Sequence, residues 1–118
     1  MKLELLKKKF TGKRILITGN TGFVGSWLSV LLHLMGAKIL GYSLKKKDKR
    51  FLSNTSEFKK KIKTIYSDIN NFDKNLNKIK KFKPQIVIHL ASQPLVLESY
   101  INTRKTYATN IMGTVNFF

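Results

Sequence analysis

Three glycines at intervals of three residues, Gly19, Gly22 and Gly25, dominate the segment TGNTGFVG at residues 18–25. A glycine-rich turn between a strand and a helix brings backbone N–H groups and the positive end of the helix dipole close to a diphosphate. In such a turn Gly19 permits the sharp reversal, Gly22 lets the diphosphate approach, and Gly25 lets the helix pack close to the strand. The spacing therefore predicts a dinucleotide-binding site, and a tight turn without a ligand is the alternative.

A strand must precede this turn and a helix must follow it. The apolar, β-branched segment RILIT predicts a buried strand over residues 14–18, and similar short apolar runs predict strands over 38–42, 62–66 and 86–90. The stretch over 43–61 mixes charged and small polar residues without a firm period. It is predicted to be a mobile loop with at most one helical turn.

Three helices are predicted from apolar residues that recur every three or four positions. The first covers residues 23–35 and ends at Gly36, the second covers 71–83 and ends at Pro84, and the third begins near residue 103. The apolar stripe of the first helix consists of Val24, Trp27, Leu28, Leu31, Leu32 and Met35. The second helix is expected to turn inward its apolar residues Phe72, Leu76 and Ile79, and to leave in solvent Lys74, Lys78 and Lys81.

Strands that alternate with helices indicate a parallel sheet covered on both faces, because parallel neighbours need a crossover that packs on the sheet. Right-handed crossovers place the strands in the order 3-2-1-4, the first half of a Rossmann-type doubly wound α/β fold. The third helix is still in mid-pattern at Phe118 and has no capping residue there. We therefore expect residues 1–118 to be the N-terminal part of an NAD(P)-binding Rossmann domain, with the catalytic and substrate-binding parts beyond Phe118.

The composition excludes several classes of protein. The 118 residues suffice for one domain, and the absence of cysteine excludes disulfide-stapled and Cys-ligated zinc folds, so no metal site is predicted. The formal net charge of +17 would favour a nucleic-acid partner, but only three of the 23 basic residues are arginine. Because phosphate and base recognition favours arginine, the excess is interpreted as solvated surface, and no nucleic-acid partner is predicted.

The sequence also contains no segment that predicts a membrane span or a secretory signal. The longest apolar stretch, residues 23–35, is interrupted by polar residues and is shorter than the ~20 residues that a span needs. The N-terminal segment carries Glu4 within its apolar patch, which is not typical of a signal peptide. We expect no membrane contact and a cytoplasmic location.

The even glycine spacing resembles that of the extended short-chain dehydrogenase/reductase family, also known as the NAD-dependent epimerase/dehydratase family. Asp68-Ile69, His89-Leu90-Ala91 and the segment NIMGT at residues 110–114 resemble further motifs of that family, in order along the chain. More narrowly, the segments similar to CDP-glucose 4,6-dehydratases are GFVGSWLS at 22–29, GYSL at 41–44, ASQPLV at 91–96 and Ser99-Tyr100. The departures from that pattern are Asn20, Val24 and Ser92, where His, Lys and Ala are frequent.

The resemblance implies a lyase that uses NAD without consuming it. A hydride leaves sugar carbon 4, water is eliminated across carbons 5 and 6, and the hydride returns to carbon 6. The implied substrate is the nucleotide sugar CDP-glucose, the product is CDP-4-keto-6-deoxyglucose, and the full-length enzyme is expected to be a homo-oligomer. The alternatives are a nucleotide-sugar epimerase or reductase of the same superfamily and a non-catalytic basic module that binds nucleotide or nucleic acid.

The residues that the resemblance and the turn assign to the cofactor lie in the glycine turn, at the ends of strands and in the last helix. They are Gly19, Asn20, Thr21, Gly22, Phe23, Val24, Gly25, Ser43, Asp68, Ile69, Leu90, Ala91, Ser92, Gln93 and Asn110. Asp68 has an alternative role as a helix-capping carboxylate. His89 is interpreted first as a hydrogen-bonded core residue, with contact to the ligand as the alternative. Asn110 has an alternative role as a helical residue in solvent.

The choice between NAD and NADP rests on conflicting signals. The second strand ends at Ser43, near where many dinucleotide sites place an acid that accepts a hydrogen bond from the ribose 2′-hydroxyl. Lys45, Lys46, Lys47 and Arg50 follow instead, and nearby cations without an acid favour NADP. The resembled dehydratases use NAD although they lack that acid, so NAD is the prediction and NADP the alternative.

Tyr42 and Lys46 match the Tyr-x-x-x-Lys pattern of the superfamily's catalytic pair. That chemistry needs both side chains on one face of a helix, where residues four apart lie about 5–6 Å from each other. Tyr42 instead ends a predicted strand, and no other tyrosine is followed by lysine four residues later. We therefore predict that no catalytic residue lies within residues 1–118.

Overall fold

The computed structural model describes residues 2–46 and 50–91. Its helices are α1 (Lys2–Phe10), α2 (Phe23–Leu34), α3 (Ser56–Lys61) and α4 (Phe72–Phe82), with short 3₁₀ turns η1 (Leu52–Asn54) and η2 (Ile69–Asn71). Its strands are β1 (Arg14–Thr18), β2 (Lys38–Ser43), β3 (Lys63–Tyr66) and β4 (Ile86–His89). The helix predicted from residue 103 onward lies outside the described residues.

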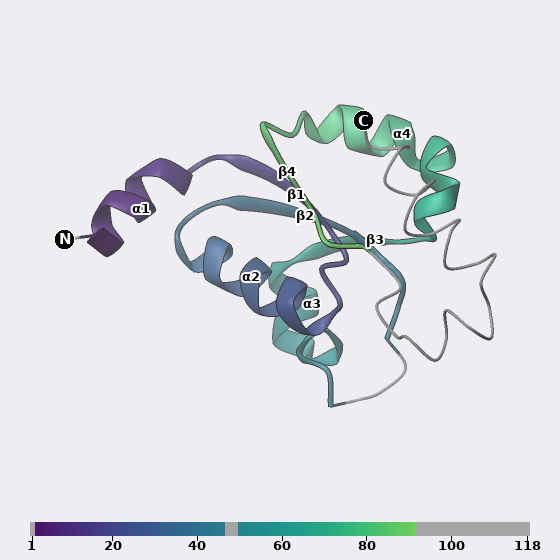
Figure 1. Ribbon diagram of the computed structural model, residues 1–118, viewed down its shortest axis with the longest axis horizontal. Coiled ribbons are helices and arrows are strands. Elements are labelled where there is room, and N and C mark those ends of the chain that lie inside the picture. The colour runs from purple at the N-terminus through teal and green to yellow at the C-terminus, as the bar shows by residue number, and fades with distance from the viewer. Residues whose placement is uncertain (1, 47–49, 92–118) are drawn as a thin grey trace.

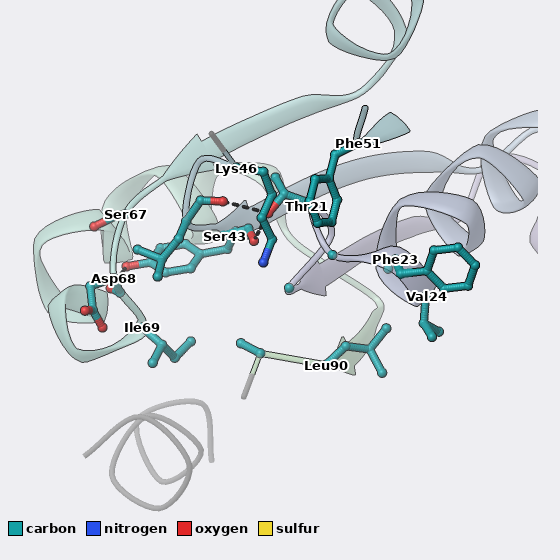
Figure 2. Close-up of a pocket in the computed structure, with 16 residues that line it drawn as sticks. Thr21, Phe23, Val24, Ser43, Lys46, Phe51, Ser67, Asp68, Ile69 and Leu90 are labelled. Carbon is teal, nitrogen blue, oxygen red and sulfur yellow. Dashed lines mark hydrogen bonds between the residues drawn. The ribbon is translucent and has the colours of Figure 1, made fainter. Parts of the chain in front are cut away.

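The four strands form one parallel sheet in the order β3-β2-β1-β4, which confirms the predicted half of a Rossmann-type fold. Figure 1 shows α2 and α3 on one side of this sheet and α4 on the other, as right-handed crossovers require. The register pairs Thr18 with both Tyr42 and His89, so the carboxyl ends of three strands lie at one edge. The segments that follow all four strands line a common pocket there (Figure 2).

Alternate residues of β1 contribute to two separate cores. Ile15 and Ile17 pack with Leu32 of α2 and Phe58 of α3. Leu16 points to the other face, where it belongs to a cluster with Tyr42 and Ile79. Both faces of β1 are buried, which explains why its sequence is continuously apolar rather than alternating.

The orientation predicted for α2 is wrong in part. Leu32 and Met35 are buried as expected and Leu28 is half-buried, but the other predicted inward residues are exposed: Val24 at 64%, Trp27 at 57% and Leu31 at 48%. The interior face consists instead of Gly25, Ser26, Ser29 and Leu32. The physical reason is close approach, because a Cβ atom at Gly25 would clash with the carbonyl oxygen of Gly19.

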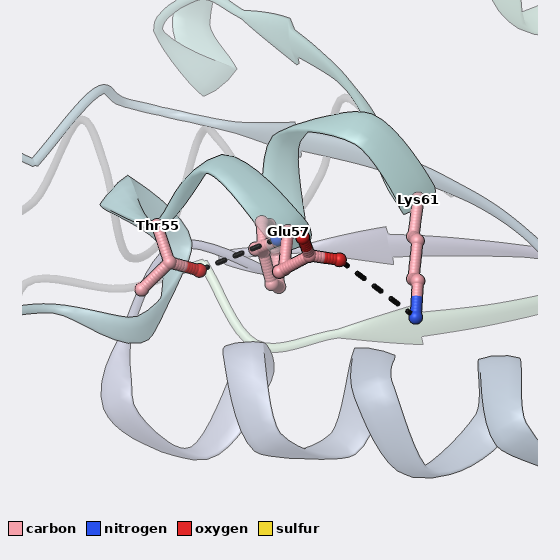
Figure 3. Close-up of polar contacts among 4 residues, drawn as sticks. Thr55, Glu57 and Lys61 are labelled. Atoms are coloured by element: carbon pink, nitrogen blue, oxygen red, sulfur yellow. Dashed lines mark hydrogen bonds and ion pairs between the residues drawn. The ribbon is translucent and has the colours of Figure 1, made fainter.

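The prediction of a loop with at most one helical turn over residues 43–61 underestimates the helical structure, which consists of η1 and α3. Thr55 caps α3, because its Oγ1 accepts a hydrogen bond from the backbone N–H of Phe58 at 3.3 Å (Figure 3). Phe58 is 3% exposed and anchors α3 in the core beneath α2. A helix of six residues is too short to show a clear period, and one cap and one buried aromatic residue specify it.

The pattern predicted for α4 is confirmed. Ile79 is buried, Phe72 and Leu76 are half-buried, and the lysines of this helix are exposed. The helix ends at Lys83, whose φ of 54° is left-handed, immediately before Pro84. Among the described residues, no helix is both long enough and apolar enough to cross a membrane.

The N-terminal helix α1 was not predicted. It contains no buried residue and carries Lys7, Lys8 and Lys9 in its last turn, so its sequence shows no core-facing stripe. The backbone N–H of Gly12, just after α1, donates a hydrogen bond to the carbonyl of Gly36 at 2.8 Å. This contact ties the segment that follows α1 to the C-terminal end of α2.

Candidate dinucleotide-binding site

A cavity of about 450 Å³ opens at the carboxyl edge of the sheet (Figure 2). Every predicted cofactor residue that the structure describes lines it, with the exception of Asn20. These lining residues are Gly19, Thr21, Gly22, Phe23, Val24, Gly25, Ser43, Asp68, Ile69, Leu90 and Ala91. Ser92, Gln93 and Asn110 lie outside the described residues.

The glycine turn occupies the centre of the cavity wall. Gly19 has a φ of 71°, the left-handed conformation that favours glycine, and its N–H donates to the carbonyl of Tyr42 at 2.9 Å. A side chain at Gly19 would lie 2.7 Å from the carbonyl carbon of Leu90, so the chain that leaves β4 also needs glycine here. A Cβ atom at Gly22 would meet only the carbonyl oxygen of Gly19, at an ordinary 3.4 Å. The fold thus requires Gly19, whereas Gly22 keeps space open in the cavity.

The N-terminus of α2 presents hydrogen-bond donors to the cavity. Gly22 is the N-cap and has no side-chain cap, and the first intrahelical bond runs from the N–H of Ser26 to the carbonyl of Gly22 at 2.9 Å. The N–H groups of Phe23, Val24 and Gly25 therefore have no partner within the helix. They lie at the positive end of the helix dipole, an arrangement that suits the oxygens of a diphosphate.

The side chain of Asn20 points away from the cavity, although the sequence placed Asn20 among the cofactor residues. It is fully buried, and its Nδ2 donates to Thr64 Oγ1 on β3 at 2.9 Å. Its amide fills the space above Gly41 of β2, where a Cβ atom would clash with it. Asn20 therefore fastens the glycine turn across two strands of the sheet.

Asp68 takes the capping role that the sequence offered as the alternative, and it also borders the cavity. Its Oδ1 accepts from the backbone N–H of Asn70 at 2.9 Å and from Asn70 Nδ2 at 3.0 Å, so it caps the turn η2. Its carbonyl accepts from the hydroxyl of Tyr42 at 2.8 Å, which holds this loop against β2.

Thr18 connects the end of β1 to the chain that leaves β4. Its Oγ1 accepts hydrogen bonds from the N–H groups of Leu90 at 3.0 Å and Ala91 at 3.1 Å, and lies 2.6 Å from His89 Nδ1. Because both lone pairs of the hydroxyl are used, its proton goes to His89 Nδ1, which makes the ring neutral with its proton on Nε2. Burial also lowers the pKa of His89 below its ordinary value.

His89 is not among the cavity-lining residues, so the structure places it as a hydrogen-bonded strand residue. Residues Leu90 and Ala91, which Thr18 holds, do line the cavity. The segment at the end of β4 therefore reaches the cavity through Leu90 and Ala91 and not through His89.

Five lining residues are not among the predicted cofactor residues, namely Tyr42, Leu44, Lys46, Phe51 and Ser67, although Lys46 is one of the cations that the sequence placed near the cofactor. Tyr42, Leu44 and Ser67 follow from the rule that ligands bind at the carboxyl ends of strands, and that rule could have found them. Phe51 comes from the stretch without a period, where no signal marks it. Its ring lies 5.4 Å from the ammonium of Lys46, a cation–π contact at the mouth of the cavity.

The fold supports the prediction that Tyr42 and Lys46 do not form the catalytic pair. Tyr42 lies in β2 and not in a helix, and its side chain is fully buried. Its hydroxyl bonds to the carbonyl of Asp68, and its ring makes an edge contact with Phe72 at 6.3 Å between centroids. These contacts give Tyr42 a structural role between the sheet and η2.

Comparisons with known proteins agree with this geometry. A family profile described as GDP-mannose 4,6 dehydratase matches residues 16–118. The CDP-glucose 4,6-dehydratase of Salmonella typhimurium is 44% identical over 110 residues, which are 93% of this chain and 31% of that protein.

Solved structures show the same fold. An epimerase from Methanothermobacter thermautotrophicus superposes with a TM-score of 0.82 at 27% identity, over 98% of this chain and 33% of that one. The UDP-glucose 4-epimerase from Brucella ovis in complex with NAD superposes with a TM-score of 0.71 at 26% identity, over 89% of this chain and 30% of that one. The chain spans about a third of the length of these relatives. Since the family profile covers most of the chain, the chain belongs to the GDP-mannose 4,6 dehydratase family, within the predicted extended short-chain dehydrogenase/reductase superfamily.

Proposed function

We propose that this chain supplies the NAD-binding half of a nucleotide-sugar 4,6-dehydratase whose substrate is CDP-glucose. The observation that carries the proposal is the cavity at the carboxyl edge of the sheet, where the uncapped N-terminus of α2 faces open space beside Gly22. The 44% identity to the Salmonella CDP-glucose 4,6-dehydratase supports the choice of reaction and substrate. The Brucella neighbour, solved in complex with NAD, supports the cofactor.

The described residues divide the work of holding the dinucleotide. The N–H groups at the start of α2 would bind the diphosphate, and Gly22 leaves room for it. Asp68 and Ile69 would hold the adenine end, and Leu90 and Ala91 would border the ribose or the sugar. When bound, NAD supplies a reversible hydride acceptor for a sugar carbon. The chain's own residues bind and orient this group.

Three parts of the proposal extend beyond the described residues. The general acid and base of the elimination are expected elsewhere in the full-length protein, because the chain spans about a third of its relatives. A homo-oligomer is also proposed, as the resemblance to the family implies, and a cytoplasmic location is proposed from the sequence.

The experiment that tests the site is a calorimetric titration of NAD into the full-length protein and into its Gly22→Val variant. We expect this substitution to abolish binding with little loss of folding, because the new side chain enters the cavity while the turn keeps its backbone. Leu34→Ala is the matched control, since Leu34 lies at the far end of the same helix and is 66% exposed. Unchanged NAD affinity in a folded Gly22→Val variant would exclude this site.

An epimerase or reductase of the same superfamily is the second candidate, favoured by the likeness to solved epimerases. The two functions leave different products. NMR of the sugar after incubation of the full-length protein with CDP-glucose distinguishes a 4-keto-6-deoxy product from an epimer. The former supports the dehydratase.

A further inference from the structure

Three polar groups at the end of β2 form a chain of hydrogen bonds that we call the hydroxyl relay: Ser43 Oγ, Thr21 Oγ1 and the carbonyl of Leu44. Thr21 Oγ1 donates to the Leu44 carbonyl at 2.6 Å and lies 2.6 Å from Ser43 Oγ (Figure 2). A carbonyl only accepts, so the single proton of Thr21 is committed to Leu44. The proton between the two hydroxyls must therefore come from Ser43.

The hydroxyl relay leaves Ser43 Oγ able only to accept further hydrogen bonds. The surroundings hold this arrangement in place. Thr21 is 1% exposed, and its carbonyl accepts from the hydroxyl of Ser53 at 3.0 Å. Ser43 is 8% exposed, is the last residue of β2 and lines the cavity.

The position of Ser43 places this hydrogen-bond acceptor where the cofactor ribose is expected. Near the end of the second strand, dinucleotide sites place an acid that accepts from the ribose 2′-hydroxyl. An acceptor-only serine offers the same hydrogen bond without a charge, whereas the oxygens of a 2′-phosphate would meet no proton there. We propose that the hydroxyl relay makes Ser43 a selector for a ribose 2′-hydroxyl over a 2′-phosphate, with Thr21 as its positioning residue. This inference rests on the proposed function.

Lys46 offers the opposite chemistry in the same cavity. Its ammonium carries donors and a positive charge, which suit a 2′-phosphate, and it lies over the ring of Phe51. If Lys46 governs selection, NADP binds at least as tightly as NAD. If the hydroxyl relay governs it, NAD binds more tightly. The two residues thus make opposing predictions for one measurement.

The test is a calorimetric titration of the full chain with NAD and with NADP. We expect NAD to bind up to about tenfold more tightly, which is the upper end of what one neutral hydrogen bond contributes. Thr21→Val keeps the shape of the side chain but frees the proton of Ser43 to donate. In this variant the ratio of the NADP dissociation constant to that of NAD should fall about tenfold, and Thr21→Ser should restore it.

A second variant keeps the test decisive if Thr21→Val does not fold. Ser43→Ala should weaken NAD about tenfold and leave NADP unchanged, because only the 2′-hydroxyl loses a partner. An unchanged ratio in both variants would overturn the inference, as would tighter binding of NADP that Lys46→Ala removes. Failure of the parent chain to bind either dinucleotide would instead overturn the proposed function itself.

Discussion

Helices α2 and α4 cover opposite faces of one sheet, yet they pack on it by different means (Figure 1). α2 carries no Asp, Glu, Lys or Arg, and its interior face consists of Gly25, Ser26, Ser29 and Leu32. α4 carries four lysines and turns apolar side chains such as Ile79 to the core. α2 is thus positioned by contact with the backbone of the glycine turn, and α4 by side chains that fill space.

The difference follows from the site that α2 serves. A helix that offers its first N–H groups to a ligand at the strand ends must approach the turn closely, and only small residues permit this approach. Several bulky residues of α2 consequently lie on its outer side, where Phe23 is 75% exposed and Leu34 is 66% exposed. α4 has no such task and follows the ordinary amphipathic rule.

The largest loss of stability is expected from a substitution that breaks the contact between α2 and the backbone of the glycine turn. Gly25→Ala should destabilise the chain by about 3 kcal/mol, because the new Cβ atom would clash with the Gly19 carbonyl and lie 2.9 Å from the Cα atom of Asn20. Urea unfolding followed by circular dichroism measures this. Gly22→Ala is the matched control, three residues earlier, and should change stability by less than about 1 kcal/mol, since its Cβ atom makes only an ordinary contact. Equal losses in the two variants would contradict the proposed packing.

The next effect concerns the side-chain packing of α4. Ile79→Ala should cost about 2–4 kcal/mol, because Ile79 is 6% exposed and its truncation leaves a cavity. Leu34→Ala on the outer side of α2 should change the free energy of unfolding by no more than about 0.5 kcal/mol. The same urea titration compares them. A Leu34 variant as destabilised as the Ile79 variant would show that the outer side of α2 is covered.

A smaller loss of stability is expected in α3. This helix lies on the same side of the sheet as α2 but carries charged residues, as α4 does. Thr55→Ala should cost about 1 kcal/mol through the lost N-cap, and Thr55→Ser should restore most of it (Figure 3). Lys61→Ala removes the exposed ion pair between Lys61 Nζ and Glu57 Oε2, which are 4.0 Å apart, and should cost less than about 0.5 kcal/mol. Thermal unfolding ranks the three variants. An ion-pair loss larger than the cap loss would contradict this ranking.

The smallest effect lies outside both helices, at the end of β4. The pKa of His89 is lowered in the folded chain, so the unfolded chain takes up this proton first as the pH falls through the ordinary histidine range. The contribution of neutral His89 to the free energy of unfolding is therefore fully present above about pH 6.5 and decreases below it. His89→Gln should reduce the loss of stability between pH 7.5 and 5.5 in urea titrations. An identical pH dependence in the variant would exclude this role.

The sequence predicts α4 and the sheet better than it predicts α2. The strand order follows from alternation and handedness, and the apolar spacing in α4 identifies Ile79 because side chains alone decide its packing. The same rule fails for Trp27, since the determinant there is a backbone contact that no apolar period records. The spacing of Gly19 and Gly25 was the available signal.

The residues of the candidate site also fall into two groups, those that the sequence could predict and those that it could not. The glycine turn and Asp68 could be predicted because a short motif or a strand end marks them. Phe51 and the direction of the Asn20 side chain could not, since both depend on where distant segments meet in space.

The fit of Asn20 over Gly41 has an evolutionary consequence. Because the amide fills the space that a side chain at position 41 would need, the two positions cannot vary independently. Any residue larger than glycine at position 41 requires the Asn20 amide to leave this space, either by a shift of its side chain or by substitution. A shift of the amide would break its hydrogen bond to Thr64, so substitutions at positions 20 and 41 are expected to occur together.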